Sequence, residues 1–409
     1  MSITRRQLLG AAAATSIFLP ARGVFANTAP TIRIGFLLDM AGPYADVSGE
    51  TSVICARQAV KDSGILERGF NVEIVAADHQ QKADVGNAII REWIDTNTVD
   101  VVAGVNNSAI ALGAVDYIVA KDKVFLATGP ASIDLTGKAC SPNTVHWALD
   151  TYCRASSTSA AMLAEGGDTW YFVTPNYAFG KSLQEIATGI VNKANGKVLG
   201  SVSYPFPGTE DFSSFLLSAS AEGPKVIAFA GASADLANCM KQLREFGLDK
   251  TMKAAALSAF VTDIHAMGLE ACHGLNFTEL FYWDRNDKTR AFTNRVKADI
   301  KNNYPNTEHA ASYAATLHYL KALGQVGADK AKGSGREMVK VMKSLKVEDD
   351  CFGTAAIRED GRVMVPSLLL QAKSPYDSAG EWDLCKVVRE TAPETAFHPI
   401  SDACDMSKM

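Results

Sequence analysis

The 409-residue sequence has little of what marks several broad classes of protein. Beyond residue 26 it contains no uninterrupted apolar run near the ~20 residues that cross a bilayer. It has no excess of basic residues, with 40 Lys and Arg against 45 Asp and Glu and a net charge of −5. The absence of a basic tail or stripe argues against a protein that binds nucleic acid or anionic lipid, and favours a small-molecule partner.

The motifs of common catalytic and cofactor sites are also missing. No Gly-x-x-x-x-Gly-Lys-Ser/Thr phosphate loop, Gly-x-Ser-x-Gly nucleophile elbow, His-Glu-x-x-His or Cys-x-x-Cys occurs, and Gly333–Gly335 does not extend to a dinucleotide fingerprint. The seven histidines show no ligand spacing, so we expect no metal, no cofactor and no enzyme activity. Asp78, His79 and Gln80 follow an expected strand, and we interpret them as a helix-capping turn, with a place in a cleft as the alternative.

The first 26 residues resemble an export signal. Arg5 and Arg6 open a charged start, residues 10–19 are apolar, and small residues precede Asn27. The paired arginines favour the twin-arginine type, and an ordinary secretory signal is the alternative. Either one predicts a soluble protein outside the cytoplasm.

Eight cysteines in an oxidising compartment allow up to four disulfides. The sequence does not choose among the pairings, and several buried free thiols are an equal alternative. The eight are Cys55, Cys140, Cys153, Cys239, Cys272, Cys351, Cys385 and Cys404.

From residue 31 the chain alternates short β-branched runs with longer amphipathic segments. This order predicts α/β architecture with doubly wound parallel sheets covered on both faces. Strands are expected at 32–38, 72–76, 99–103, 124–127, 170–173, 197–202 and 226–230, and helices at 49–63, 83–95, 109–120, 182–194 and 235–246.

An internal repeat predicts two similar lobes. Residues 101–109 align without gaps on residues 226–234, and each stretch is a strand, a turn of small residues and a serine that opens a helix. A second repeated segment, a strand that ends in small residues, occurs at residues 123–132 and again at residues 253–258. The repeat places Ser108, Ser132, Ser233 and Ser258 at strand ends, where open parallel sheets bind ligands. For each serine, a simple helix N-cap is the alternative.

Several segments carry a family likeness. These are residues 33–44 (RIGFLLDMAGPY), 49–50, 174–180 (TPNYAFG), 211–213 and 312–315. In this order and spacing they resemble the periplasmic solute-binding proteins of branched-chain amino acid type ABC transporters. The resemblance implies two lobes joined by a three-crossover hinge, a ligand cleft between them, a membrane permease as partner, and a monomer in the periplasm without nucleic acid.

The resemblance also implies the lobe boundaries and the ligand residues. Lobe one is expected over 31–147 plus 282–352, and lobe two over 148–281 plus 353–409. The residues implied to bind ligand are Tyr44, Asn106, Asn107, Ser108, Pro130, Ala131, Ser132, Tyr177, Ala232, Ser233, Ser258 and Phe260.

One departure from the family bears on the ligand. Binders of branched-chain amino acids place a glutamate near Ser258 to accept the substrate ammonium, and residues 257–260 here are Leu-Ser-Ala-Phe. A buried ammonium without a carboxylate partner is costly. We therefore expect a receptor that delivers a small organic acid, aromatic or hydroxylated, to an importer. A receptor for an amino acid or amide, with Asp39, Asp235 or Asp263 as counter-charge, is the first alternative, and a periplasmic enzyme is a weaker one.

Overall fold

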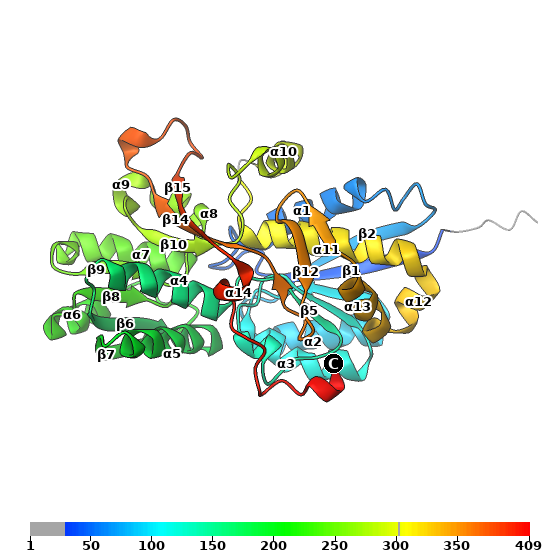
Figure 1. Cartoon of the computed structure of the whole chain (residues 1–409), viewed down its shortest axis with the longest axis horizontal. Coiled ribbons are helices and arrows are strands. Elements are labelled where there is room, and N and C mark those ends of the chain that lie inside the picture. The colour runs from blue at the N-terminus through cyan, green and yellow to red at the C-terminus, as the bar shows by residue number, and fades with distance from the viewer. Residues whose placement is uncertain (1–28, 302) are drawn as a thin grey trace, which may run out of the picture.

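The computed structural model describes residues 29–301 and 303–409, so the expected export signal at 1–26 lies outside the described residues. The chain forms two α/β lobes side by side, as Figure 1 shows. No helix in the described part of the chain is long and apolar enough to cross a membrane.

Lobe one is built on a parallel five-stranded sheet. Its strand order is β2 (Asn71–Asp78), β1 (Thr31–Leu38), β3 (Val101–Gly104), β4 (Val124–Ala127) and β5 (Thr144–His146). The central strands β3 (VVAG) and β4 (VFLA) are buried at every residue, as expected for strands covered on both faces. The helices of this lobe are α1 (Gly49–Asp62), α2 (Ala83–Asp95), α3 (Ser108–Ala120), α10 (Asp287–Val296), α11 (Thr307–Val326), α12 (Ala328–Gly333) and α13 (Gly335–Ser344).

Lobe two repeats this plan. Its parallel sheet has the order β7 (Lys197–Tyr204), β6 (Thr169–Pro175), β8 (Val226–Phe229) and β9 (Lys253–Ala256), which matches β2-β1-β3-β4 of lobe one. Its helices are α4 (Thr151–Ala164), α5 (Ala178–Lys193), α6 (Ser213–Glu222), α7 (Ser233–Glu245), α8 (Val261–Met267) and α9 (Leu269–Cys272). Ser108 and Ser233 are the first residues of α3 and α7, so the predicted repeat and the predicted fold class are confirmed.

The remaining elements join the lobes. An antiparallel sheet of β10 (Asn276–Glu279), β14 (Ser367–Ala372) and β15 (Cys385–Thr391) packs into the core of lobe two. A small sheet of β11 (Val347–Asp349), β12 (Gly353–Ile357) and β13 (Val363–Met364) packs into the core of lobe one. The short elements are α14 (Pro393–Ala396) and the 3-10 turns Ile133–Thr136, Leu248–Lys250, Pro375–Asp377 and Met406–Lys408.

The C-terminal segment departs from the boundaries expected from the sequence. A boundary after residue 352 falls inside the β11–β12 hairpin, where Val347 pairs with Ala355 and both side chains pack in the lobe-one core. After β15 the chain returns to lobe one, where Phe397 joins the same core. Figure 1 shows the C-terminus beside lobe one. Residues 353–365 and 396–409 therefore belong with lobe one, because hairpin pairing and burial hold them there.

The cysteines follow the alternative in which several remain buried free thiols. Cys140 and Cys404 form a disulfide that ties the C-terminal segment to lobe one. The other six cysteines are buried free thiols. The upper limit of four disulfides is therefore not reached.

Candidate functional site

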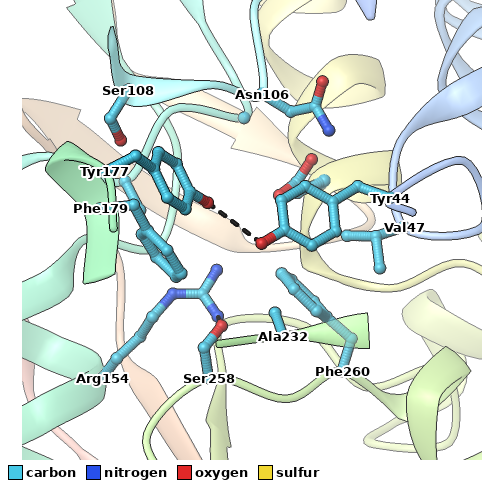
Figure 2. Close-up of a pocket in the computed structure, with 13 residues that line it drawn as sticks. Tyr44, Val47, Asn106, Ser108, Arg154, Tyr177, Phe179, Ala232, Ser258 and Phe260 are labelled. Atoms are coloured by element: carbon cyan, nitrogen blue, oxygen red, sulfur yellow. Dashed lines mark hydrogen bonds between the residues drawn. The ribbon is translucent and has the colours of Figure 1, made fainter. Parts of the chain in front are cut away.

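A cavity lies between the two lobes, at the carboxyl ends of both parallel sheets. Lobe one lines it with Tyr44, Val47, Asn106, Ser108, Gly129, Ala131 and Glu308, and lobe two with Arg154, Tyr177, Phe179, Ala232, Ser258 and Phe260. In Figure 2 Asn106 and Ser108 lie opposite Arg154 and Ser258, with the two tyrosines between them. A ligand here would contact both lobes, which is the geometry of a site that closes by lobe movement.

A short hydrogen-bond chain orients Asn106. The backbone N–H of Gln81 donates to His79 Nδ1 (3.0 Å), so His79 carries its proton on Nε2 and donates it to Asn106 Oδ1 (2.7 Å). Burial lowers the pKa of His79, which keeps the ring neutral in this role. Asn106 Oδ1 also accepts from the Asp39 N–H (3.0 Å), and Asn106 Nδ2 is buried with no partner in the described part of the chain. Asn106 therefore offers an unused donor to the cavity.

Arg154 supplies the positive charge of the cavity. It lies near the start of α4 and is 2% exposed. Its Nε donates to the Leu149 carbonyl (3.1 Å), its Nη1 donates to Ser258 Oγ (2.7 Å), and its guanidinium lies 4.5 Å from the centre of the Phe260 ring. Among the described residues no carboxylate lies within 4.0 Å of this guanidinium. Burial lowers the pKa of Arg154, because the charged form loses its hydration.

Glu308 supplies a carboxyl group from the first turn of α11. Its Oε2 is buried without a partner among the residues that the structure describes, and burial raises the pKa of Glu308 well above its ordinary value. The nearby Arg154 charge opposes this rise, whereas Glu279, Asp263 and Asp39 add to it. The cavity thus holds a cation and a carboxyl group whose burial favours the neutral form.

Aromatic rings bridge the lobes at the cavity. Tyr44 of lobe one and Tyr177 of lobe two share a hydrogen bond between their hydroxyls (3.0 Å), drawn as the dashed line in Figure 2. The Phe206 ring stacks on both, with centroid distances of 5.4 Å to Tyr44 and 4.6 Å to Tyr177. These contacts join the two lobes around the site.

The structure brings eight of the twelve predicted residues to the cavity wall: Tyr44, Asn106, Ser108, Ala131, Tyr177, Ala232, Ser258 and Phe260. Ser258 lines the wall and also holds Arg154, so it positions a charge as well as facing the ligand space.

Four predicted residues do not line the cavity. The Asn107 side chain caps α3 by accepting from Ala109 and Ile110, and Ser132 caps the 3-10 turn by accepting from Asp134 N. The Pro130 carbonyl hydrogen-bonds His146 Nε2 (2.7 Å). Ser233 opens α7 with φ of +53°. For Asn107 and Ser132, the N-cap interpretation describes their contacts.

The three aspartates considered as counter-charges are also absent from the wall. Asp39 accepts from the N–H groups of Gly42 and Tyr44, Asp235 accepts from the Tyr204 hydroxyl (2.8 Å), and Asp263 accepts from the Phe260 N–H (2.9 Å). Their oxygens hold loops and helix ends in place. Among the described residues, Glu308 is the acidic residue that lines the cavity.

Sequence reasoning missed Arg154 and Glu308. Arg154 is the single charged residue in α4 (TYCRASSTSAAMLA), and a lone charge among small residues is a signal that could have drawn attention. Glu308 gives no such signal, because an acidic residue in a first helical turn is ordinary.

Comparison with known proteins gives a consistent family. A family model described as periplasmic binding protein matches residues 31–380. A periplasmic binding protein from Burkholderia mallei is 38% identical, with a TM-score of 0.85, and the match covers 90% of this chain and 97% of the Burkholderia mallei chain. A branched chain amino acid ABC transporter periplasmic ligand-binding protein from Burkholderia xenovorans is 34% identical, with a TM-score of 0.77 and the same coverage.

A solute-binding protein of an ABC transporter from R. palustris, in complex with benzoate, has a TM-score of 0.78 at 18% identity, covers 89% of this chain and 97% of its own, and shares the fold. No curated protein sequence matches the chain. The family match spans most of the chain, and the two Burkholderia structures are 38% and 34% identical to it over 90% of its length. The chain therefore belongs to the periplasmic binding proteins, the solute-binding proteins of ABC transporters of the branched-chain amino acid type.

Proposed function

We propose that this receptor captures a small carboxylate with a single negative charge, aromatic or hydroxylated, by closing its lobes over it. The proposal rests on the observation that the Arg154 cation is buried at the ligand cavity without a carboxylate partner among the described residues. An unpaired buried charge is costly, and an anionic ligand would compensate it. The guanidinium also offers the planar donor geometry that suits a carboxylate.

The remaining wall supports an apolar body next to that carboxylate. Tyr44, Tyr177, Phe179 and Phe260 contribute aromatic surface, and burying apolar ligand area against it contributes ~25 cal/mol per Å². The free donor of Asn106 and the Ser108 hydroxyl lie on the opposite wall, where they can orient polar groups. The fold relative that binds benzoate is compatible with such a ligand.

An amino acid receptor is the second candidate. The free carboxyl oxygen of Glu308 in the cavity favours it, and so does the likeness to the Burkholderia xenovorans protein described as a branched chain amino acid binder. In this alternative Arg154 would bind the carboxylate of the amino acid and an ionised Glu308 would accept its ammonium.

The family and the N-terminal sequence indicate where the receptor acts and what receives its ligand. Residues 1–26 would direct export to the periplasm, where the receptor acts as a soluble monomer. The closed, loaded receptor would deliver its ligand to the permease of an ABC importer.

Calorimetry with benzoate and its neutral isostere benzamide tests the proposal, with leucine and valine in parallel. We expect benzoate to bind and to raise the melting temperature by mass action, whereas benzamide binds at least about tenfold more weakly because it carries no charge for Arg154. Equal binding of benzamide and benzoate would contradict the role of Arg154. Binding of leucine and valine alone would favour the second candidate.

A further inference from the structure

Glu308 differs from the other buried carboxyl groups near the cavity in what its oxygens contact. Asp39, Asp263 and Glu279 all accept hydrogen bonds from backbone N–H groups. Glu308 Oε2 is buried in the cavity wall with no partner, and no Lys, Arg or His nitrogen lies within 4.0 Å of the Glu308 carboxyl among the described residues. An unpartnered buried polar atom that faces a ligand space indicates a contact made by the ligand.

The charges around Glu308 decide which form it takes. Arg154 on α4 is the cation that faces it, and three carboxyl groups face it as well: Glu279 on β10, Asp263 on α8 and Asp39 after β1. On its own helix His309 is buried, and burial lowers the pKa of His309 to about 3, so that ring adds no positive charge. One cation cannot compensate four buried carboxylates, and the group without donors is the one that keeps a proton.

The start of α11 does not reverse this conclusion. The positive end of a helix favours an anion, but Asn306 Oδ1 already accepts from the Glu308 and His309 N–H groups. The helix terminus therefore offsets only part of the cost of a buried carboxylate. Burial raises the pKa of Glu308 well above its ordinary value, which agrees with the contact pattern.

We infer that Glu308 is the specificity-determining residue of this cavity: as a neutral acid it donates a hydrogen bond to a second oxygen of the ligand, a hydroxyl or a carbonyl. The inference rests on the proposed carboxylate function, and it predicts that carboxylates with such an oxygen bind more tightly than carboxylates without one, such as benzoate. An ammonium group has no lone pair to accept this hydrogen bond, so a 2-hydroxy acid is bound and the 2-amino acid of the same shape is rejected.

Two matched ligand pairs test the inference: leucine against 2-hydroxy-4-methylpentanoate, and phenylalanine against 3-phenyllactate. Calorimetry at pH 7 uses protein dialysed free of ligand, in two buffers of different ionisation enthalpy. We expect each hydroxy acid to bind at least about tenfold more tightly than its amino acid partner, with the same heat in both buffers because no proton is released.

Two variants separate the roles of the proton and the charge. Glu308→Gln keeps an N–H donor and should bind the hydroxy acids within a few-fold of the unmodified protein, whereas Glu308→Leu should weaken them by about tenfold. Asp349→Asn is the control, because Asp349 is a buried carboxyl group of lobe one outside the cavity. It should leave both ligand classes unchanged.

Other results would overturn the inference. Tighter binding of leucine with release of about one proton, or loss of hydroxy acid binding in Glu308→Gln, would show that Glu308 acts as an anion. Either result would leave carboxylate binding by Arg154 intact. If no carboxylate of either class binds, or if binding survives Arg154→Met, the proposed function fails and this inference fails with it.

Discussion

Two buried arginines in similar surroundings should respond in opposite ways to the same substitution. Arg154 and Arg362 are 2% and 0% exposed, and their guanidinium groups lie over phenylalanine rings, at 4.5 Å from Phe260 and 4.3 Å from Phe397. Arg362 has a buried carboxylate partner in Asp150 (3.4 Å), whereas Arg154 has none within 4.0 Å. Replacing each by methionine therefore separates a structural charge from a ligand-binding charge.

The magnitudes follow from what each change leaves behind. Arg362→Met leaves the buried Asp150 carboxylate without its cationic partner and should lower the free energy of unfolding by about 3–5 kcal/mol. Arg154→Met gives up hydrogen bonds to two neutral acceptors, Leu149 O and Ser258 Oγ, but it also removes an uncompensated buried charge. The two terms oppose each other, so the ligand-free variant should stay within about 2 kcal/mol of the unmodified protein.

Ligand binding should show the reverse order. Loss of a buried, charge-assisted contact with the carboxylate costs at least about 3 kcal/mol, or more than a hundredfold in affinity, in Arg154→Met. Arg362 does not line the cavity, so Arg362→Met should bind benzoate or 3-phenyllactate nearly normally below its melting temperature. Urea unfolding of ligand-free protein and calorimetry measure the two effects. Equal destabilisation by both substitutions, with affinity retained in Arg154→Met, would show that Arg154 is a structural charge like Arg362.

Three further predictions concern the contacts around the cavity and the fold. Tyr44→Phe and Tyr177→Phe should each weaken ligand binding by about 2- to 10-fold in calorimetry, because each removes the hydrogen bond between the lobes. The double variant should bind no more weakly than the single variant that binds more weakly, because both substitutions remove the same hydrogen bond. Additive losses would contradict this. Replacing Cys140 and Cys404 by serine should lower unfolding stability by about 2–4 kcal/mol without changing affinity, and a changed affinity would show that the C-terminal segment acts on the site. Burial raises the pKa of Asp263 to about 7, so the folded protein holds a proton that the unfolded chain releases above pH ~4. The free energy of unfolding of the ligand-free protein should therefore fall as the pH rises from about 4 to 7, and then level off. Asp263→Asn should flatten this profile in thermal unfolding, and an unchanged slope would assign the proton elsewhere.

Much of the architecture could be predicted because it depends on local pattern. The apolar runs that became β3, β4 and β8 are buried at every residue, so their composition reflects their position in a covered sheet. The gapless repeat worked for a similar reason: the same turn joins β3 to α3 and β8 to α7, and Ser108 and Ser233 open the two helices.

The C-terminal segment after residue 352 could not be placed by the same means. Its strands β12 to β15 pair antiparallel with partners in both lobes, and which lobe takes which strand depends on pairing that sequence order does not reveal. The expected boundary after residue 352 was wrong because it divides the β11–β12 hairpin. The Cys140–Cys404 pairing spans 264 residues, and spacing alone gives no information at that range.

The ligand site also contains residues that the local sequence pattern predicts and residues whose role depends on how the lobes are arranged. Residues on the turns after the strands, such as Ser108, Tyr177 and Ser258, reach the cavity wall as their position in the fold dictates. Asn107 and Ser132 sit one residue away from wall residues, where side-chain direction and capping decide, and both cap instead. Arg154 projects from a helix rather than a strand end, so its role became visible only when the two lobes were placed together.

The claim that Arg154 binds a ligand carboxylate is tested most directly by a crystal structure with the hydroxy carboxylate that stabilises the protein most. We expect the carboxylate between the closed lobes, with its oxygens about 2.7–2.9 Å from the Arg154 guanidinium nitrogens. A ligand whose carboxylate lies away from Arg154, with the guanidinium still bonded only to Leu149 and Ser258, would contradict it.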